Sequence, residues 1–572
     1  MRRLLGLLIL LFSISFVAPA QMKDAGPSMP PNQFVDRPDW WKTAVFYEIY
    51  PRSFADSNND GTGDLKGITA HLDYLQKLGI DAIWITPCFP SPQVDIGYDV
   101  SDYRNIDPQY GTLADFDQLV AEAKRRGIKV ILDFVVNHSS DQHKWFQESR
   151  KSKTNPYRDY YIWRDGKGPD QPPNNWLSVF GGSGWEHDAT TGQWYYHAFD
   201  PHQPDLNWRN PVVEKEMFDI TRFWYQRGVY GFRLDAVDTL FEDAQLRDNP
   251  SSPEQYAFVV NKQQRLYTAN LPEVHTELQR LRRVADEFPG RVLIGETWTS
   301  TPEKLTAYYG PSNNELQMPM YFNFTMLNKL SAPEFRAKIA AIENNPVHGW
   351  PVFVLSNHDI RRWLDRYGDG AHNPQIAKLM SALYLTLRGT VIMYYGEEIG
   401  MTNNDPTRLE DVKDLVGKKG WPKEKGRDGE RTPMQWDVTN NAGFNAGAHP
   451  WLPVSSNYVN VNVASEAADS NSLLNWYRQL IALRRSMPAL YEGEYVPLRN
   501  SDSHTLSYLR QAGKSKVLVI LNMSGNEQTI TFPSGEFGSA TGKVLLSSEA
   551  QPLASLESVR LGPYGVILLE PK

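Results

Sequence analysis

Three carboxylate residues each stand at the end of a short apolar segment of the sequence. Asp235 follows the letters Gly-Phe-Arg-Leu, Glu296 follows Leu-Ile-Gly, and Asp359 follows Ser-Asn-His. A single acid in such a place is often only a helix cap or a turn former. Three acids that meet at one end of a fold raise one another's pKa values, which favours a functional explanation.

The residues around these acids favour chemistry on glycosidic bonds. Arg233 lies two residues before Asp235, so a strand would point both side chains to one face and keep the carboxylate ionised. His138 and His358 are expected to add neutral hydrogen-bond donors. Cleavage of a glycosidic bond requires a carboxylate that attacks the anomeric carbon and an acid that protonates the leaving oxygen. It also requires negative charge beside the cationic transition state.

Short apolar segments that alternate with helix-period stretches must position these residues. Eight segments are β-branched and aromatic-rich, too short for helices and apolar on both faces, which is typical of a buried parallel sheet. Eight strand–helix units predict an α/β fold, a (β/α)8 TIM barrel with its active groups at the carboxyl ends of the strands. A doubly wound open sheet is the alternative, but no Gly-rich phosphate turn follows the first strand. The predicted strands are residues 45–50, 82–85, 129–135, 231–235, 292–296, 318–322, 352–357 and 391–395.

Two intervals between the predicted strands are too long for simple connections. Residues 139–209 are polar and rich in Gly and Trp, which predicts an inserted domain B after the third strand. Residues 400–470 are expected to form a long irregular loop. From residue 491 a period-2 pattern with Gly, Asn and Ser turns predicts a C-terminal antiparallel β-sandwich. The predicted division is a catalytic barrel in 37–138 and 210–490, domain B in 139–209, and the β-sandwich in 491–572.

The N-terminus is typical of an export signal. Arginines at 2 and 3 precede an apolar run over 4–17, and Ala18-Pro-Ala20 fits a cleavage site. The run is shorter than the roughly 20 residues of a membrane span, with an uncleaved anchor as the alternative. The sequence thus predicts a signal peptide in 1–20 and a tether in 21–36. The mature protein is expected in the periplasm or outside the cell, free of the membrane, as a monomer or homodimer.

Composition excludes several other classes of protein. The chain has 572 residues, with 59 Lys and Arg against 67 Asp and Glu and a net charge of -8. This acidic balance argues against nucleic acid as a partner. Hydrophobic residues at 41% and charged residues at 22% exclude disordered and fibrous proteins. The single cysteine, Cys88, excludes an internal disulfide framework.

Four segments resemble the signature regions of the α-amylase family, glycoside hydrolase family 13, and they follow one another in family order. They are Asp133-Phe-Val-Val-Asn-His138, Gly231-Phe-Arg-Leu-Asp235, Gly295-Glu296-Thr297 and Asn357-His358-Asp359. Three more segments are similar to the oligo-1,6-glucosidase and α-glucosidase subfamily. They are Gln203-Pro-Asp-Leu-Asn207, Arg431-Thr-Pro-Met-Gln-Trp-Asp437 and Trp451-Leu-Pro-Val454. The resemblance extends from about Trp40 to the C-terminus and implies a barrel, a domain B and a C-terminal sandwich.

The resemblance implies a role for each residue of the predicted site. Asp235 would be the nucleophile, Glu296 the general acid and base, and Asp359 the group that stabilises the transition state and grips sugar hydroxyls. An acid–arginine pair would block the non-reducing end of the substrate, which implies a pocket and exo-action. The residues expected to bind the first sugar are Asp95 and Tyr98 of an Asp-Ile-Gly-Tyr motif, His138, Arg233, His358, and Arg427 in preference to Arg431.

The resemblance also implies activity on small α-glucosides. The leading expectation is a retaining exo-α-glucosidase that releases terminal α-1,4-linked glucose from maltose and short malto-oligosaccharides. Ala236, after the nucleophile, is similar to the residue of α-1,4-cleaving maltases, whereas valine accompanies α-1,6 cleavers. The alternatives are an α-1,6-preferring oligoglucosidase, and a transglucosylase or isomerase that forms trehalose or a sucrose isomer. A non-catalytic binding subunit is disfavoured because all three carboxylates are present.

A calcium site is expected in the loop after the first strand. Oxygen-bearing residues occupy alternate positions there, as the first ligands of an EF-hand loop do. The twelfth position is Gly67 rather than Glu, so the loop is not an EF-hand, and a turn without an ion is the alternative. The subfamily has a similar calcium loop, which implies a structural Ca²⁺. The expected ligands are Asp56, Asn58, Asp60, Thr62 through its backbone carbonyl, and Asp64.

Overall fold

The computed structural model of the chain describes residues 37–571, with gaps at 169, 253–262, 300, 345–348, 499–502 and 550–554. The predicted signal peptide in 1–20 and tether in 21–36 lie outside the described residues. Within the described part of the chain, no helix combines the length and the apolar character that crossing a membrane requires.

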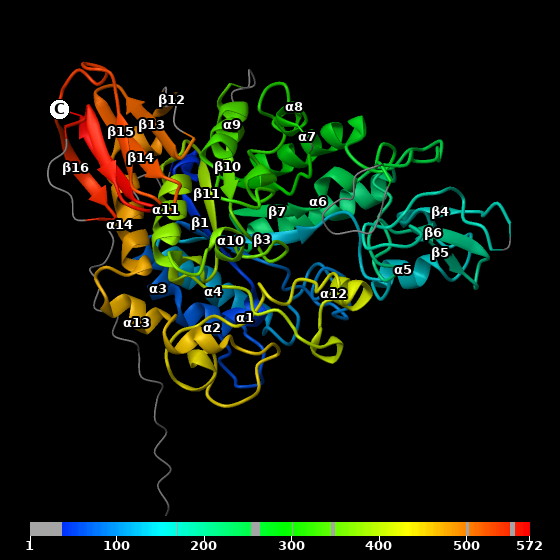
Figure 1. The fold of residues 1–572 in the computed structure, drawn as a ribbon. Helices are drawn as coiled ribbons and strands as arrows, with labels where there is room; N and C mark the ends of the chain where they lie inside the picture. The colour runs from blue at the N-terminus through cyan, green and yellow to red at the C-terminus, as the bar shows by residue number, and fades with distance from the viewer. Residues whose placement is uncertain are drawn as a thin grey trace, which may run out of the picture.

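Eight parallel strands form the centre of the protein (Figure 1). They are ordered β10-β11-β1-β2-β3-β7-β8-β9, and a parallel bridge between Tyr321 and Phe353 brings the two outer strands together. This nearly closed barrel confirms the predicted TIM fold. The strands are β1 (Val45–Ile49), β2 (Ala82–Ile85), β3 (Lys129–Val135), β7 (Gly231–Asp235), β8 (Val292–Gly295), β9 (Met318–Pro319), β10 (Val352–Val354) and β11 (Thr390–Tyr394).

Strands β9 and β10 are shorter than predicted, because other contacts replace the sheet hydrogen bonds at their carboxyl ends. Strand β9 ends at Pro319, which has no N–H group to extend the ladder. Beyond the end of β10, the carbonyl of Leu355 accepts a hydrogen bond from Arg366, and the Ser356 hydroxyl donates to Glu397. The segment that carries Asp359 therefore leaves the sheet and turns into the mouth of the barrel.

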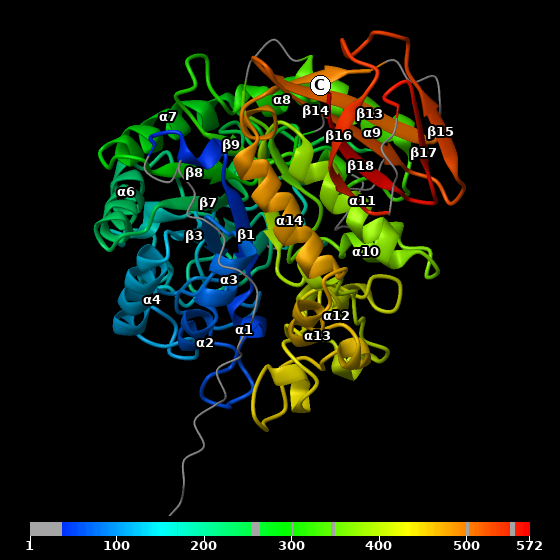
Figure 2. The same cartoon turned by 90° about the vertical axis from the view of Figure 1, so that its left-hand side faces the viewer.

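Helices surround the barrel, and α14 crosses it beside the C-terminal sheets (Figure 2). Helix α4 (Leu113–Arg125) begins after Thr112, whose side chain forms a capping box with Asp115. Helix α6 (Pro211–Gln226) begins after Asn210, whose side chain accepts from the N–H of Val212. The other helices include α2 (Leu65–Ala70), α3 (Leu72–Leu78), α7 (Pro272–Asp286), α8 (Pro302–Ala307), α9 (Ala332–Glu343), α10 (Trp363–Tyr367), α11 (Asn373–Thr386) and α14 (Leu473–Ser486).

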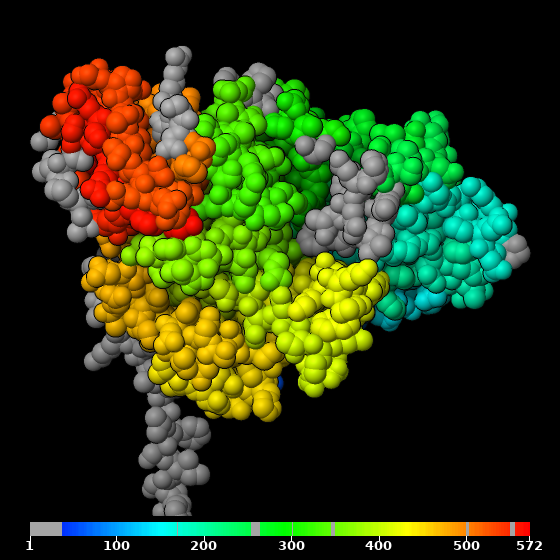
Figure 3. Space-filling model, viewed as in Figure 1, coloured from blue at the N-terminus to red at the C-terminus, as the bar shows by residue number. Residues whose placement is uncertain are grey.

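A small antiparallel sheet interrupts the barrel between β3 and α6, within the predicted domain B. Strands β4 (Trp163–Arg164), β6 (Gln193–Tyr196) and β5 (Trp185–Asp188) pair in that order. The rings of Trp176 and Trp185 stack with their centroids 5.7 Å apart, which provides this part with an apolar core of its own. The segment projects from one side of the molecule, away from the C-terminal sheets (Figure 3).

The C-terminal region consists of two antiparallel sheets, as predicted. Their facing apolar side chains form a separate core that includes Leu518, Ile530 and Val559. The larger sheet has the order β12-β13-β14-β18-β16, and the smaller one pairs β15 with β17. The strands are β12 (Glu494–Pro497), β13 (Thr505–Ala512), β14 (Ser515–Asn522), β15 (Gln528–Thr531), β16 (Gly542–Ser547), β17 (Ser558–Leu561) and β18 (Val566–Pro571).

The long segment 400–470, expected to be irregular, contains two short helices. Helix α12 (Leu415–Gly420) is capped by Asp414, and α13 (Val463–Ala468) is capped by Asn462. The irregular prediction missed them because each is a single capped unit of six residues with no helical period to detect. The turn after α12 brings Arg427 to the barrel mouth.

Candidate active site

The three predicted carboxylates lie around one cavity at the carboxyl ends of the barrel strands. Asp235 is the last residue of β7, Glu296 follows β8, and Asp359 follows the turn after β10. All three line a cavity of about 910 Å³. The structure therefore brings together three acids that are separated by up to 124 residues in sequence, counting from 235 to 359.

Arg233 is the cation that holds two of these acids. Its guanidinium pairs with Asp235 Oδ1 at 2.7 Å, Glu296 Oε2 at 2.9 Å and Asp133 Oδ1 at 2.9 Å. Burial raises the pKa of Asp235 well above its usual value, and Arg233 opposes this shift. Arg233 is fully buried and lies behind the cavity wall, so it acts on the nucleophile candidate rather than facing open space.

Both carboxylate oxygens of Glu296 accept hydrogen bonds. Its Oε2 accepts a hydrogen bond from the backbone N–H of Ala236 at 2.8 Å, and its Oε1 accepts from Trp298 Nε1 at 3.0 Å. Ala236 provides that N–H from the left-handed region, with φ 44° and ψ 40°, which is a strained conformation for a residue with a Cβ. Sequence reasoning missed Trp298, although its position two residues after the acid was a usable signal.

His358 carries a positive charge at neutral pH, contrary to the expectation of a neutral donor. Its Nδ1 lies 2.6 Å from Glu48 Oε1 and its Nε2 lies 3.1 Å from Asp359 Oδ2. Burial alone would lower the pKa of His358, but Asp359 and Glu48 together raise it to about 9. Burial would likewise raise the pKa of Asp359, but His358 and two arginines hold it well below its usual value. Asp359 is therefore ionised.

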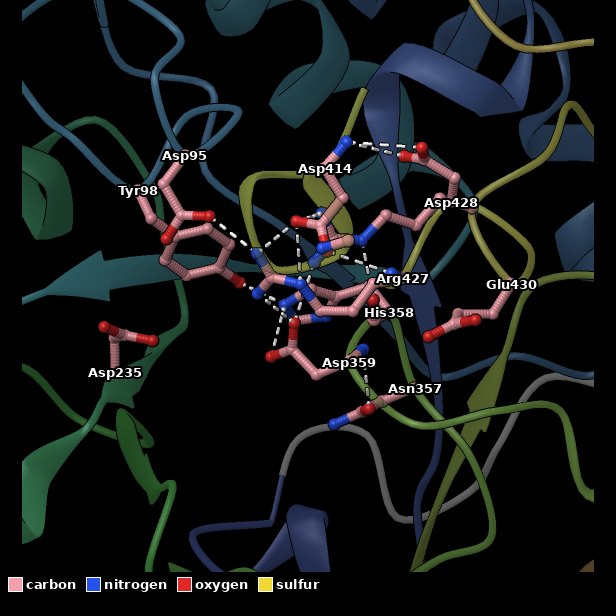
Figure 4. Close-up of polar contacts among 12 residues, drawn as sticks. Asp95, Tyr98, Asp235, Asn357, His358, Asp359, Asp414, Arg427, Asp428 and Glu430 are labelled. Carbon is pink, nitrogen blue, oxygen red and sulfur yellow. Dashed lines mark hydrogen bonds and ion pairs between the residues drawn. The ribbon is translucent and has the colours of Figure 1, made fainter. Parts of the chain in front are cut away.

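Arg427 connects the acids at one end of the cavity (Figure 4). It contacts Asp95 Oδ1 at 2.7 Å, Asp359 Oδ1 at 2.9 Å and Asp414 Oδ1 at 2.6 Å. Arg431 contacts Asp359 Oδ1 at 2.8 Å but does not line the cavity. Figure 4 shows Asp235 apart from this network. Of the two arginines considered from the sequence, Arg427 faces the cavity and Arg431 supports Asp359 from behind.

Tyr98 and His138 complete the buried end of the cavity. Tyr98 Oη lies 3.0 Å from Asp133 Oδ2 and 2.5 Å from His358 Nε2, and its ring stacks on His358 at 5.4 Å. His138 Nε2 donates to the carbonyl of Tyr98 at 3.2 Å. Burial lowers the pKa of His138 to about 3, so this imidazole is neutral, as expected. Seven of the nine predicted site residues line the cavity directly, and so does Ala236. The seven are Asp95, Tyr98, His138, Asp235, Glu296, Asp359 and Arg427.

The rest of the cavity is formed by residues that the sequence did not single out. Domain B contributes Val179, Phe180 and Phe199. The barrel side contributes Trp298 and Phe322, whose rings stack at 4.5 Å with an angle of 7° between planes. Leu266 and Met326 also line the cavity and are 56% and 43% exposed, which places them at its mouth.

The predicted calcium loop folds through successive turns in which side-chain oxygens accept backbone N–H groups. Asp56 accepts from Asn58, Asn58 from Asp60, and Asp60 from Thr62. Asp64 caps α2 by accepting from Gly67 at 2.7 Å. Among the described residues, no group of three or more His, Cys, Asp or Glu side chains is close enough to hold a metal. The expected ligands include an amide and a backbone carbonyl as well as carboxylates, and such an all-oxygen donor set suits Ca²⁺.

Comparison with known proteins gives consistent similarities over most of the chain. Residues 48–493 match the family described as alpha amylase, catalytic domain, and residues 506–568 match the alpha-amylase SusG C-terminal domain. A probable alpha-glucosidase of Rhizobium meliloti (strain 1021) is 43% identical, with 86% of this chain and 91% of the relative covered. An oligo-1,6-glucosidase of Parageobacillus thermoglucosidasius is 40% identical, with 92% and 98% covered. The crystal structure of an alpha-glucosyl transfer enzyme superposes with a TM-score of 0.87 at 39% identity, covering 93% of this chain and 99% of that one.

Proposed function

The chain belongs to the α-amylase family of glycoside hydrolases, and from that premise we propose that it is an exported, retaining exo-α-glucosidase. Its substrates are maltose and short malto-oligosaccharides, from which it releases the terminal non-reducing glucose. The observation that supports this proposal most strongly is the ionic end of the cavity. Arg427 joins Asp95 and Asp359 there, and this ion-paired network would bind the hydroxyls of a terminal sugar and stop a longer chain from passing.

The proposed reaction uses the three carboxylates in two steps. In the first, Asp235 attacks the anomeric carbon, and Glu296 gives its proton to the glycosidic oxygen as the bond to the leaving sugar breaks. In the second, water attacks the same carbon, Glu296 takes its proton, and Asp235 is released as the carboxylate. Two inversions retain the α-configuration. Asp359, ionised beside His358, stabilises the cationic transition state.

Linkage preference is proposed from the residue after the nucleophile. Ala236 is small, directly follows Asp235 and lines the cavity, and we place the second sugar of the substrate beside it. We expect Ala236→Val to shift the ratio of kcat/KM values from maltose towards isomaltose. An unchanged ratio would reject Ala236 as the residue that sets linkage preference. A wild-type kcat/KM that is higher on isomaltose than on maltose would favour the α-1,6 alternative suggested by the oligo-1,6-glucosidase relative.

A transglucosylase or isomerase is the second candidate, supported by the similarity to an alpha-glucosyl transfer enzyme. It would share the glucosyl-Asp235 intermediate and differ only in whether water or a sugar hydroxyl resolves it. The test is to incubate the mature chain separately with maltose, isomaltose, sucrose and trehalose and to follow all products by NMR, with Asp235→Asn as control. Release of α-glucose from maltose, lost in the variant, supports the hydrolase. New disaccharides with little free glucose would favour the second candidate.

A structural calcium ion is proposed for the loop at 56–64. When bound, it would hold the turns of the loop together through Asp56, Asn58, Asp60, Asp64 and a backbone carbonyl. None of these residues lines the cavity, so the ion would serve folding rather than catalysis. Chelation is expected to lower the Tm of the wild-type protein but not that of an Asp60→Ala variant. Equal Tm values before and after chelation of the wild type would reject the ion.

Export is proposed from residues 1–20, which lie outside the described residues. Cleavage after Ala20 would leave a mature chain that begins at Gln21, in the periplasm or outside the cell. N-terminal sequencing of the protein recovered from those fractions tests this proposal, and an intact N-terminus would contradict it. The mature enzyme is proposed to work as a monomer or homodimer.

A further inference from the structure

Three groups contact the Glu296 carboxyl, and they divide unequally between its two oxygens. Oε2 accepts a hydrogen bond from the backbone N–H of Ala236 at 2.8 Å and forms an ion pair with the guanidinium of Arg233 at 2.9 Å. Oε1 receives the indole N–H of Trp298 at 3.0 Å. We propose that Trp298 is a positioning residue that fixes the orientation of the Glu296 carboxyl and sets how readily this group gives up its proton. The proposal rests on the acid–base role of Glu296 in the proposed function.

The distribution of donors decides which oxygen works as the acid. A proton on Oε2 would face a permanent cation and an amide N–H, whereas a proton on Oε1 would face one neutral N–H, that of Trp298. The transferable proton therefore belongs on Oε1, the oxygen that Trp298 contacts. An indole N–H can donate but never accept a hydrogen bond, so Trp298 can stabilise the carboxylate form and cannot take the proton itself.

Stacking fixes the orientation of the Trp298 indole relative to Glu296. Its ring stacks on Phe322 with centroids 4.5 Å apart and an angle of 7° between planes, and both residues line the cavity. Phe322 is 5% exposed, so it provides a fixed surface for the half-buried indole. A donor that is already oriented costs little ordering when the carboxyl becomes charged, which is the condition for effective electrostatic stabilisation.

Both steps of the proposed reaction depend on this contact. In the first step it favours release of the proton from Glu296 to the glycosidic oxygen. In the second step it keeps the carboxylate directed at the attacking water. Replacing the indole by a phenyl ring retains an aromatic wall and the stack but removes the N–H. Glu296 should then hold its proton to higher pH and give it up less readily in the first step, and its carboxylate should be less well directed at the water in the second.

The test is the pH dependence of kcat/KM and kcat on maltose, measured from about pH 5 to 10, where both limbs of the profile are visible. For Trp298→Phe we expect the alkaline limb of kcat/KM to move up by about 0.5–1 pH unit, the scale of one hydrogen bond to a charged group. We also expect kcat near neutral pH to fall by about three- to tenfold on the same energetic scale. The matched control is Trp350→Phe, which removes an indole bond to Thr390 Oγ1 outside the cavity and should leave both limbs in place.

A second variant keeps the indole N–H of Trp298 but removes the Phe322 ring on which the indole stacks. Phe322→Leu retains the indole N–H, so its alkaline limb should move less than that of Trp298→Phe. A shift as large as that of Trp298→Phe, or a Trp298→Phe profile that is lowered equally at every pH with unmoved limbs, would overturn the proposal. Glu296→Gln separates this failure from failure of the proposed function. If that variant keeps wild-type activity, the acid–base assignment itself is wrong, whatever Trp298 does.

Discussion

The two walls of the cavity are built from different chemistry. The buried wall is charged or polar, and each of its side chains is held by hydrogen bonds or ion pairs. The open wall carries a group of apolar side chains, two of which are largely exposed to solvent, beside polar residues such as Gln264 and Lys304. The buried wall consists of Asp95, Tyr98, His138, Asp359 and Arg427. The apolar residues of the open wall are Leu266, Trp298, Phe322 and Met326.

The buried wall can recognise one particular sugar, whereas the open wall can accept different groups attached to that sugar. A wall of fixed donors and acceptors discriminates strongly, because a ligand that lacks one hydroxyl leaves a buried group without its partner. An apolar wall distinguishes ligands by shape and area, which carries much less free energy per contact. The buried wall therefore suits a single invariant glucose, and the open wall suits a leaving group or acceptor that can vary.

Glu296 stands where the two walls meet, and its replacement should give the largest effect. Glu296→Gln removes the proton donor and is expected to lower kcat/KM on maltose by about 10²–10⁴-fold. With α-glucosyl fluoride, whose leaving group needs no protonation, the loss in the first step should be much smaller. Steady-state rates on both substrates measure the contrast. An equal loss on the two substrates would mean that Glu296 does not protonate the leaving group.

Replacement of Arg427 tests how much the buried wall contributes to activity. Arg427→Ala removes the shared cation of Asp95, Asp359 and Asp414, and truncating one partner of a buried charge network costs about 3–5 kcal/mol. We expect kcat/KM on maltose to fall by about 10²-fold or more, on the scale seen for desolvated charge pairs. Arg408→Ala is the matched control, because Arg408 pairs with Asp411 on the exposed surface. Equal effects of the two variants would show that the buried ion pairs of Arg427 contribute no more to activity than an exposed surface pair does.

His358 makes the buried wall sensitive to alkaline pH. Its folded-state pKa of about 9 lies above the ordinary value of 6.5, since the effect of Asp359 and Glu48 exceeds that of burial. The stability from this charge is fully present below about pH 6.5 and is lost as pH rises through about 9. We expect the free energy of unfolding and kcat/KM to decline over that interval, and His358→Asn to flatten the decline in stability. Denaturant unfolding at several pH values measures this, and a decline that persists unchanged in the variant would assign it to another group.

Most residues of the buried wall could be predicted from the sequence, but those of the open wall could not. Asp235, Glu296 and Asp359 could be found because each ends a recognisable apolar segment, and strand ends converge in a barrel. The charge of His358 could not be predicted, because it depends on Glu48, which lies 310 residues away in sequence. Asp414 escaped notice because it belongs to a segment without periodicity, and its role appears only when the segment folds back onto Arg427.

The open wall was missed for a different physical reason. Leu266 and Met326 lie in connections without regular structure, where apolar residues at no fixed spacing carry no signal of their own. Phe322 fell at the end of the predicted strand 318–322, but it begins a short 3-10 helix instead. The fold was easier because its evidence is repeated: eight strands must be buried in the same way, and their composition shows it. The open wall is formed by single residues from several segments, so no repeated sequence pattern marks it.

Replacement of Met326, on the open wall, should have the smallest effect on kcat/KM of the substitutions proposed. It is 43% exposed, so Met326→Ala removes apolar contact area but leaves no buried polar group without a partner. At about 25 cal/mol per Å² of apolar contact, a partly exposed side chain contributes roughly 1 kcal/mol or less. We expect kcat/KM on maltose to change by no more than about fivefold. A larger apolar aglycone, such as that of an aryl α-glucoside, should lose more than maltose does, because it covers more of the wall. The comparison is made by measuring both substrates with wild type and variant. A loss on maltose as large as that of Arg427→Ala would show that the open wall selects its ligand as strictly as the buried one.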